Sequence, residues 1–412
     1  MLVTASMVVP RLTGEDVRVH WPPLHADWMP RVGIMTVPAV AVGLTLVLVL
    51  PHASRRLPWR GVLAAGFAGT WTWVMALAMT EGTTGLSRVF ERPQEYVRDA
   101  QTVDSIHTML QTFVDRIPYS HPDNWHVHVA GHPPGALLWF VGLDRLGVTD
   151  PFWIGVVCVT AASTAVVAVL ITLGALGSED LARWALPWIV LAPSAVWTGV
   201  SGDAVFAAVA AWGVALLALA ATRRSAGAAV GAGILLGLCV YLSYGLVLLA
   251  ILAIAVLVIA RTWRPLPWAM GGAVAVAALF TAGGFAWWEA YPVLRERYYD
   301  GIASERAYWY WVWGDLAAWT FTGGLAVWAA VPYAGRVLRR NALAQLAAAA
   351  FLTILIACLS GMSKAETERI FLPFTIWVVA LPALLPARWH RPLLASQVAL
   401  ALGVQHLLLT RW

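Results

Sequence analysis

The residues best suited to chemistry in this sequence are two carboxylates, Glu95 and Asp99, in a polar stretch over residues 81–133. We expect an amphipathic helix after Pro93, over residues 94–113, and positions i and i+4 share one face of a helix. A carboxylate near a membrane surface can take the proton of a substrate hydroxyl and make its oxygen a nucleophile. The alternative is a solvated helix whose charges only keep it soluble.

Four histidines follow in the same stretch, His121, His126, His128 and His132. Their spacing differs from that of a helical zinc site such as HExxH, so we predict no metal site among them. His132 precedes Pro133 and Pro134, and two prolines fix a rigid turn where the chain enters the membrane. A plain turn at a helix start explains the prolines but not the histidine.

A second charged cluster, Lys364, Glu366, Glu368 and Arg369, occupies a short turn over residues 362–369 between two apolar segments. Ionisable groups at a membrane boundary are costly unless water or a ligand compensates them. A lysine and an arginine together suit a phosphate or diphosphate headgroup, and a neighbouring glutamate can hold the arginine in place. A salt-bridged turn without a ligand is the alternative.

The elements that position these residues must be membrane helices. Of the 412 residues, 60% are hydrophobic and 12% are charged, which leaves too little polar surface for a soluble domain. Apolar stretches near the length that crosses ~30 Å of hydrocarbon recur along the chain. We therefore predict an all-α polytopic protein of about twelve spans, over residues 33–51, 61–80, 152–176, 184–199, 203–221, 226–242, 244–260, 267–287, 316–334, 343–361, 370–386 and 393–409.

The arginines indicate the orientation. Five clusters lie near residues 55–60, 223–224, 261–264, 336–340 and 388–391. The positive-inside rule places them in the cytoplasm, and loops 81–133, 288–315 and 362–369 then lie outside. Residues 134–148 are short for a span, so we expect them to re-enter or to lie at the interface. We divide the chain into an outer interfacial segment, residues 1–32, and a single membrane domain, residues 33–412.

Several remaining features have ordinary explanations. The net charge of +5 is spread over short loops, which does not suggest nucleic acid. The three cysteines lie in apolar runs and are expected to be small buried hydrophobes. The tryptophans and tyrosines of the loop over residues 288–315 are typical of an aromatic belt, although they also suit a carbohydrate or lipid cleft. Asp203 is a lone acid at a helix mouth, where capping is the expected role.

The order of these motifs resembles the GT-C superfamily of glycosyltransferases, which use polyprenyl-phosphate sugars. The likeness covers roughly residues 60–390 and is one of layout and short motifs. It rests on the acidic outer loop, His132-Pro133-Pro134, Pro193-Ser194 followed by Asp203, and Glu368-Arg369 before Pro373. Among its branches, the chain looks most like actinobacterial cell-envelope enzymes, such as methylthioxylose, arabinofuranosyl or mannosyl transferases.

The resemblance implies a GT-C-like helix arrangement and an inverting transfer to a glycan or glycolipid acceptor on the outer face of the plasma membrane. The base would be an acid of the first outer loop, by position Glu95 or Asp99. The family often has an adjacent acidic pair at the helix exit, where this chain has Glu81 alone. Residues expected to bind the donor phosphate are Lys364, Arg369 and Arg98, with Arg88 and Arg92 as rivals. Residues expected to contact the substrate are Tyr96, His128, His132, Glu366 and Glu368.

Two alternatives stay open at this point. No cofactor is required, although a Mg²⁺ or Mn²⁺ ion between carboxylate and phosphate is compatible with the chemistry. A lipid or solute transporter, or flippase, is the other reading of the fold, but it would need ionisable groups within the spans. A transferase should bring Glu95 or Asp99 close to Arg369 in one outward cleft, whereas a transporter should show a polar path through the middle of the bundle.

Overall fold

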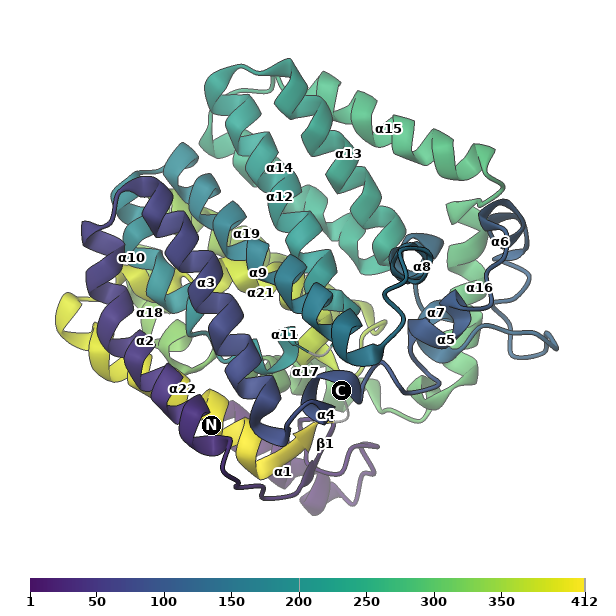
Figure 1. The fold of residues 1–412 in the computed structure, drawn as a ribbon, viewed down its shortest axis with the longest axis horizontal. Coiled ribbons are helices and arrows are strands. Elements are labelled where there is room, and N and C mark those ends of the chain that lie inside the picture. Colours follow the sequence, from purple (N-terminus) through teal and green to yellow (C-terminus); the bar gives the residue numbers. More distant parts are fainter. Residues whose placement is uncertain (200, 411–412) are drawn as a thin grey trace.

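The computed structural model describes residues 1–199 and 201–410, which are mostly helical (Figure 1). The α-helices are α1 (Leu2–Thr13), α2 (Thr36–Arg56), α3 (Trp59–Ala78), α4 (Thr84–Ser87), α5 (Tyr96–Ala100), α6 (Ile106–Thr112), α7 (Val127–Ala130), α8 (Pro134–Arg145), α9 (Pro151–Leu176), α10 (Glu179–Val190), α11 (Ala195–Thr198), α12 (Gly202–Arg223), α13 (Ala226–Leu242), α14 (Leu249–Ile259), α15 (Leu266–Ala282), α16 (Trp287–Asp300), α17 (Tyr308–Gly323), α18 (Leu325–Val337), α19 (Ala342–Ser360), α20 (Thr367–Ile370), α21 (Leu372–Val378) and α22 (His390–Leu407). Two short strands, β1 (Ala26–Trp28) and β2 (Leu408–Thr410), pair with each other. The predicted all-α class is confirmed.

Within the described residues, five helices are long and apolar enough to cross a membrane: α2, α3 with the turn that follows it, α9, α12 and α19. Two bent pairs, residues 266–300 and 372–407, bring the number to seven if each pair counts as one span. These helices indicate a membrane-spanning protein. The twelve spans that we predicted are not confirmed.

Part of the difference arises because α13 has only 17 residues, and part because glycine interrupts an apolar segment. Gly324, with φ of 79°, separates α17 from α18 inside the predicted span over residues 316–334. Gly284, with φ of 105°, follows α15, and the chain then bends by 74° into α16. Glycine adopts such backbone angles at little steric cost, so each one can redirect the chain. Hydropathy averaged over a window does not detect these breaks.

Helix α12 lies at the centre of the bundle, where it packs against α9, α13, α14 and α21. It is rich in alanine and buried along most of its length. Small residues let helix backbones approach closely in a membrane. The same effect joins α13 to α15: a Cβ atom at Gly233 would overlap the carbonyl oxygen of Ala269, so no larger residue fits there without a shift.

The first outer loop differs from the prediction. In place of one amphipathic helix over residues 94–113, the chain forms α5 and α6. The break occurs because Ser105 starts a new helix, its hydroxyl accepting a hydrogen bond of 3.2 Å from the amide of Thr108. Helix α8 begins at Pro134, as the proline turn indicated, and its 12 residues are too few to cross the bilayer.

The segment before α2 lies against the rest of the molecule. Helix α1 packs on α17, where the Tyr310 hydroxyl donates a 2.8 Å hydrogen bond to the carbonyl oxygen of Ser6. Strand β1 then pairs antiparallel with β2, with Ala26 opposite Thr410. In Figure 1, α1 and β1 lie at the lower edge, while α5, α6, α7 and α16 gather at the right. This pairing closes one side of the cavity described next.

Candidate functional site

A cavity of about 520 Å³ lies between the first outer loop, the turn before α20 and the β1–β2 pair. Sites for small molecules typically measure ~300–1,000 Å³. Most of the side chains around it are polar or charged, and the full lining is His25, Asp27, Arg92, Gln94, Glu95, Val127, His128, Glu366 and Leu409. The cavity therefore combines the size of a ligand site with groups that form hydrogen bonds.

One imidazole links the two predicted clusters. Glu95 is buried, and its Oε1 lies 2.7 Å from Nδ1 of His128. On the other side of the ring, Nε2 lies 3.4 Å from a terminal nitrogen of Arg369. One ring nitrogen therefore faces a carboxylate and the other faces a guanidinium. The structure thus brings Glu95 and Arg369 to one cleft, with His128 between them.

Arg369 lies beneath this cleft and contacts two carboxylates. One terminal nitrogen is 2.5 Å from Oδ2 of Asp203, and the other is 3.1 Å from Oε2 of Glu366. Burial acts to lower the pKa of Arg369, but the charges of Asp203 and Glu366 outweigh burial and raise the pKa above its ordinary value. The predicted capping role of Asp203 is wrong: Ser201 is the N-cap of α12, and the Asp203 carboxylate pairs with Arg369.

The turn before α20 has an unusual backbone. Ala365 and Glu366 have φ values of 68° and 64°, a region that costs a residue with a Cβ atom ~1–3 kcal/mol. Surrounding groups hold this conformation. The Ala365 amide donates to Asp315 Oδ1 at 2.9 Å, and Arg306 donates to the carbonyl oxygen of Lys364 at 2.6 Å. The result is that Glu366 faces both Arg369 and Arg306.

Glu366 stays ionised in this setting. Its Oε1 lies 3.5 Å from Nδ1 of His25 and 3.6 Å from a terminal nitrogen of Arg306. Burial acts to raise the pKa of Glu366, but the contact with His25 and the charges of Arg369 and Arg306 together hold it below its usual range. The turn therefore places at the cavity an ionised carboxylate that is paired with Arg369 and Arg306.

The second predicted carboxylate, Asp99, faces away from the cavity. Its Oδ1 lies 2.8 Å from Nδ1 of His126, and its Oδ2 accepts a 3.1 Å hydrogen bond from the amide of the same residue. Asp99 is buried and is not part of the cavity lining. Two carboxylates that share a face on an ideal helix are thus separated here, because Glu95 precedes α5 as its N-cap while Asp99 lies within it.

Tyr96 and His132 stand behind His128. Tyr96 stacks on Phe140 with ring centroids 4.9 Å apart and meets His132 edge-on at 5.8 Å. Nδ1 of His132 is 2.8 Å from the carbonyl oxygen of His128, and burial lowers the pKa of His132. A neutral His132 can donate this hydrogen bond. Both residues support the His128 backbone and ring instead of lining the cavity.

Three other predicted residues lie apart from the cavity. The Lys364 ammonium donates a 2.9 Å hydrogen bond to the carbonyl oxygen of Ala303, which ties the turn to the segment before α17. Glu368 is completely buried within the bundle, and Arg98 is exposed on α5. None of the three lines the cavity.

Three polar residues that line the cavity, His25, Asp27 and Gln94, were not candidates from the sequence, and Arg92 was only a rival for binding the donor phosphate. A weak signal existed, because His25 and Asp27 alternate with Leu24 and Ala26, as polar and apolar residues do along a half-buried extended segment. Nothing local indicated which part of the molecule that segment would join.

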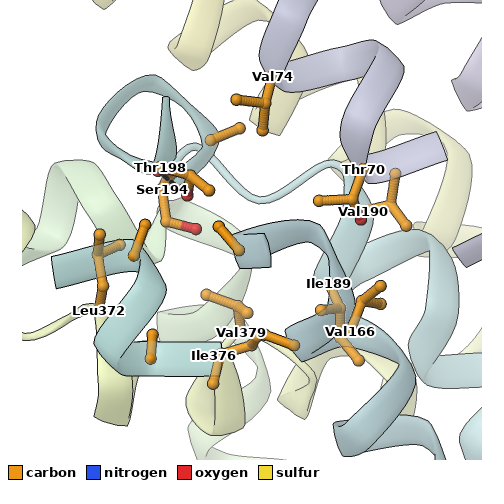
Figure 2. Close-up of a pocket in the computed structure, with 15 residues that line it drawn as sticks. Thr70, Val74, Val166, Ile189, Val190, Ser194, Thr198, Leu372, Ile376 and Val379 are labelled. Atoms are coloured by element: carbon orange, nitrogen blue, oxygen red, sulfur yellow. Dashed lines mark hydrogen bonds between the residues drawn. The ribbon is translucent and has the colours of Figure 1, made fainter. Parts of the chain in front are cut away.

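A second cavity, of about 40 Å³, lies inside the helix bundle (Figure 2). Side chains from α3, α9, α10, α11, α12 and α21 surround it, most of them alanine, valine, leucine or isoleucine. The polar groups at this cavity are the hydroxyls of Thr70, Ser194 and Thr198. Figure 2 shows Val74, Val166, Ile189, Val190, Leu372, Ile376 and Val379 around this cavity, together with these three hydroxyl side chains.

Over residues 1–199 and 201–410, no three His, Cys, Asp or Glu side chains are grouped so that they could hold a metal ion. The chain matches no family model and no curated protein. The chemistry of the cavity and its surroundings is therefore the basis for assigning a function.

Proposed function

We propose that this protein is an inverting membrane glycosyltransferase, which moves a sugar from a polyprenyl-phosphate donor to a glycan or glycolipid acceptor. The observation that carries the proposal is the contact chain from Glu95 through His128 to Arg369 at the edge of a polar cavity. The arginine distribution supports placing this cavity on the outer face of the plasma membrane.

In the proposed reaction, Glu95 removes the proton of the acceptor hydroxyl, and the hydroxyl oxygen forms a bond to the anomeric carbon of the donor sugar. The bond between that carbon and the phosphate oxygen breaks, and its electron pair leaves with polyprenyl phosphate. A positioned base typically contributes ~10²–10⁴-fold to such a step. His128 keeps the carboxylate of Glu95 in one orientation, and Asp99 is less suited because both its oxygens face His126.

The departing phosphate gains negative charge, which cationic groups stabilise. Arg92 is the arginine that lines the cavity, so we assign it first contact with the phosphate. Arg369 lies deeper and is neutralised by Asp203 and Glu366, so its role is to hold His128 and Glu366 in place.

The test is transfer of radiolabelled sugar from polyprenyl-phosphate mannose and polyprenyl-phosphate arabinose to an envelope glycan fraction in membranes. Glu95→Gln should lower the transfer rate by ~10²–10⁴-fold. Glu91→Gln is the matched control, because Glu91 is an exposed acid of the same loop that does not line the cavity. Asp99→Asn should retain more activity than Glu95→Gln.

Two results would contradict the proposal. Unchanged transfer by folded Glu95→Gln protein would remove Glu95 as the base. Absence of transfer from both donors by folded wild-type protein would instead favour a lipid or solute transporter.

A further inference from the structure

Four consecutive residues form a tight turn at the edge of the polar cavity. The amide of Glu95 donates a 3.1 Å hydrogen bond to the carbonyl oxygen of Arg92, which closes a β-turn over residues 92–95. Pro93 occupies the second position of this turn, where its fixed φ is favourable. The other three residues of the turn, Arg92, Gln94 and Glu95, all line the cavity. The turn therefore places three neighbouring polar side chains at one site.

His128 holds this turn in two places. Its amide donates a 3.2 Å hydrogen bond to the carbonyl oxygen of Gln94. Its ring meets the next residue of the turn, with Nδ1 2.7 Å from Oε1 of Glu95. The backbone at Gln94 is thereby fixed directly beside the carboxylate that we assigned as the base.

The side chain of Gln94 is accessible to a ligand. It is exposed at the cavity, and within residues 1–199 and 201–410 its amide group has no hydrogen-bond partner. A primary amide offers two N–H donors and one carbonyl acceptor. Sugar hydroxyls both donate and accept hydrogen bonds, so one such group can bond to either end of this amide.

The order of residues along the turn matches the order of the groups in the proposed reaction. In an inverting transfer, the attacking oxygen and the departing group lie on opposite sides of the anomeric carbon. We assigned Glu95 to the attacking hydroxyl and Arg92 to the departing phosphate. The first and fourth Cα atoms of a β-turn are within about 7 Å of each other. The part of the sugar that lies between the two reacting groups is therefore next to Gln94.

We propose that Gln94 binds the 2-hydroxyl of the donor sugar and selects donors that carry this group. The 2-hydroxyl is attached to the carbon beside the anomeric carbon, and hydrogen bonds to it strengthen in the transition state of glycosyl transfer. Gln94 takes no part in bond making or breaking. The inference rests on the proposed function for the roles of Arg92 and Glu95.

A comparison of two proteins with two donors tests this contact. The proteins are wild type and Gln94→Ala, and the donors are polyprenyl-phosphate mannose and its 2-deoxy analogue. With mannose, Gln94→Ala should lower kcat/KM about tenfold, which corresponds to the loss of one hydrogen bond. With the 2-deoxy analogue, the two proteins should have equal kcat/KM, because the hydroxyl that Gln94 binds is missing. The intrinsic reactivity of the 2-deoxy sugar cancels, since each comparison is made between proteins with the same donor.

A general structural effect of the substitution would give a different result. It would lower kcat/KM by the same factor with both donors, and that outcome would overturn the contact with the 2-hydroxyl. Gln101→Ala is the matched control, because Gln101 is an exposed glutamine of the same loop that does not line the polar cavity. A tenfold loss with mannose in Gln101→Ala would likewise overturn the assignment.

A binding measurement separates this inference from the proposed function. Calorimetric titration of the protein in nanodiscs needs no transfer, and the probes are polyprenyl-phosphate mannose and polyprenyl phosphate without a sugar. Gln94→Ala should weaken binding of the first probe severalfold and leave binding of the second unchanged. Equal effects on both probes, or no effect on either, would overturn the role of Gln94. If wild-type protein shows this selective binding but transfers no sugar, the sugar contact stands and the proposed transferase activity fails.

Discussion

The buried pair of Asp203 and Arg369 predicts a measurable coupling free energy. Each residue is 5% exposed, and their charged groups are 2.5 Å apart. When one member of a buried ion pair is removed, the other charge stays buried without its partner, which typically costs ~3–5 kcal/mol. We therefore expect Arg369→Met to lower the free energy of unfolding by about this amount, because Asp203 then loses the contact that offsets its burial.

The converse substitution should cost less. In Asp203→Asn, Arg369 keeps its 3.1 Å contact with Glu366, and the new amide still accepts a hydrogen bond, so we expect a loss of ~1–3 kcal/mol. In the double variant, Asp203→Asn with Arg369→Met, neither position carries a buried charge without its partner. Its loss should be smaller than the sum of the single losses by about 2 kcal/mol, within the usual range for residues in contact.

The assay is unfolding of purified protein in detergent micelles by a denaturing detergent, followed by fluorescence of the 24 tryptophans. Asp16→Asn in the exposed pair with Arg18 serves as a control and should change the free energy of unfolding by ~0–1 kcal/mol. Additive single and double losses, within ~0.5 kcal/mol, would refute a direct interaction between Asp203 and Arg369.

Three further predictions concern single positions. The pKa of Glu366 lies below that of an unfolded glutamate, about 4.3, so its ionised carboxylate stabilises the fold fully at neutral pH. The difference in free energy of unfolding between wild type and Glu366→Gln should therefore be largest at pH 7 and shrink as the pH falls below about 4. A difference that does not depend on pH would contradict this. Gly233→Leu should cost ~1–3 kcal/mol in thermal unfolding because α13 and α15 touch there, while Gly271→Leu, whose Cβ atom would meet open space, should not. Ser105→Ala removes the N-cap of α6 and should cost ~1 kcal/mol, measured as faster proteolysis of the first outer loop; equal rates would argue against the cap.

The sequence alone determined the class of the protein and the location of its charged clusters. Composition is a property of the whole chain, so it predicted a helical membrane protein without any contact being known. Proline chemistry is equally local, and it predicted the start of α8 at Pro134. The turn over residues 362–369 also stood out, because charge between two apolar segments requires a physical explanation in any fold.

The choice among the candidate residues depended on tertiary structure. Asp203 and Arg369 are 166 residues apart in sequence, and no periodicity of α12 indicates that its first turn meets α20. Likewise, Glu95 and not Asp99 lines the cavity because α5 ends after five residues and the following segment returns with His126 against Asp99.

The number of spans and the wall of the site also depended on structure. A glycine such as Gly324 can continue a helix or end it, and only the packing around it selects φ of 79°. His25 and Asp27 acquire a role only through pairing of β1 with β2, a long-range ladder that local pattern cannot specify. The sequence alone therefore determined which residues are costly to place in a membrane, because that cost is a local property. Tertiary structure decided which of them meet, because those contacts arise from packing between distant segments.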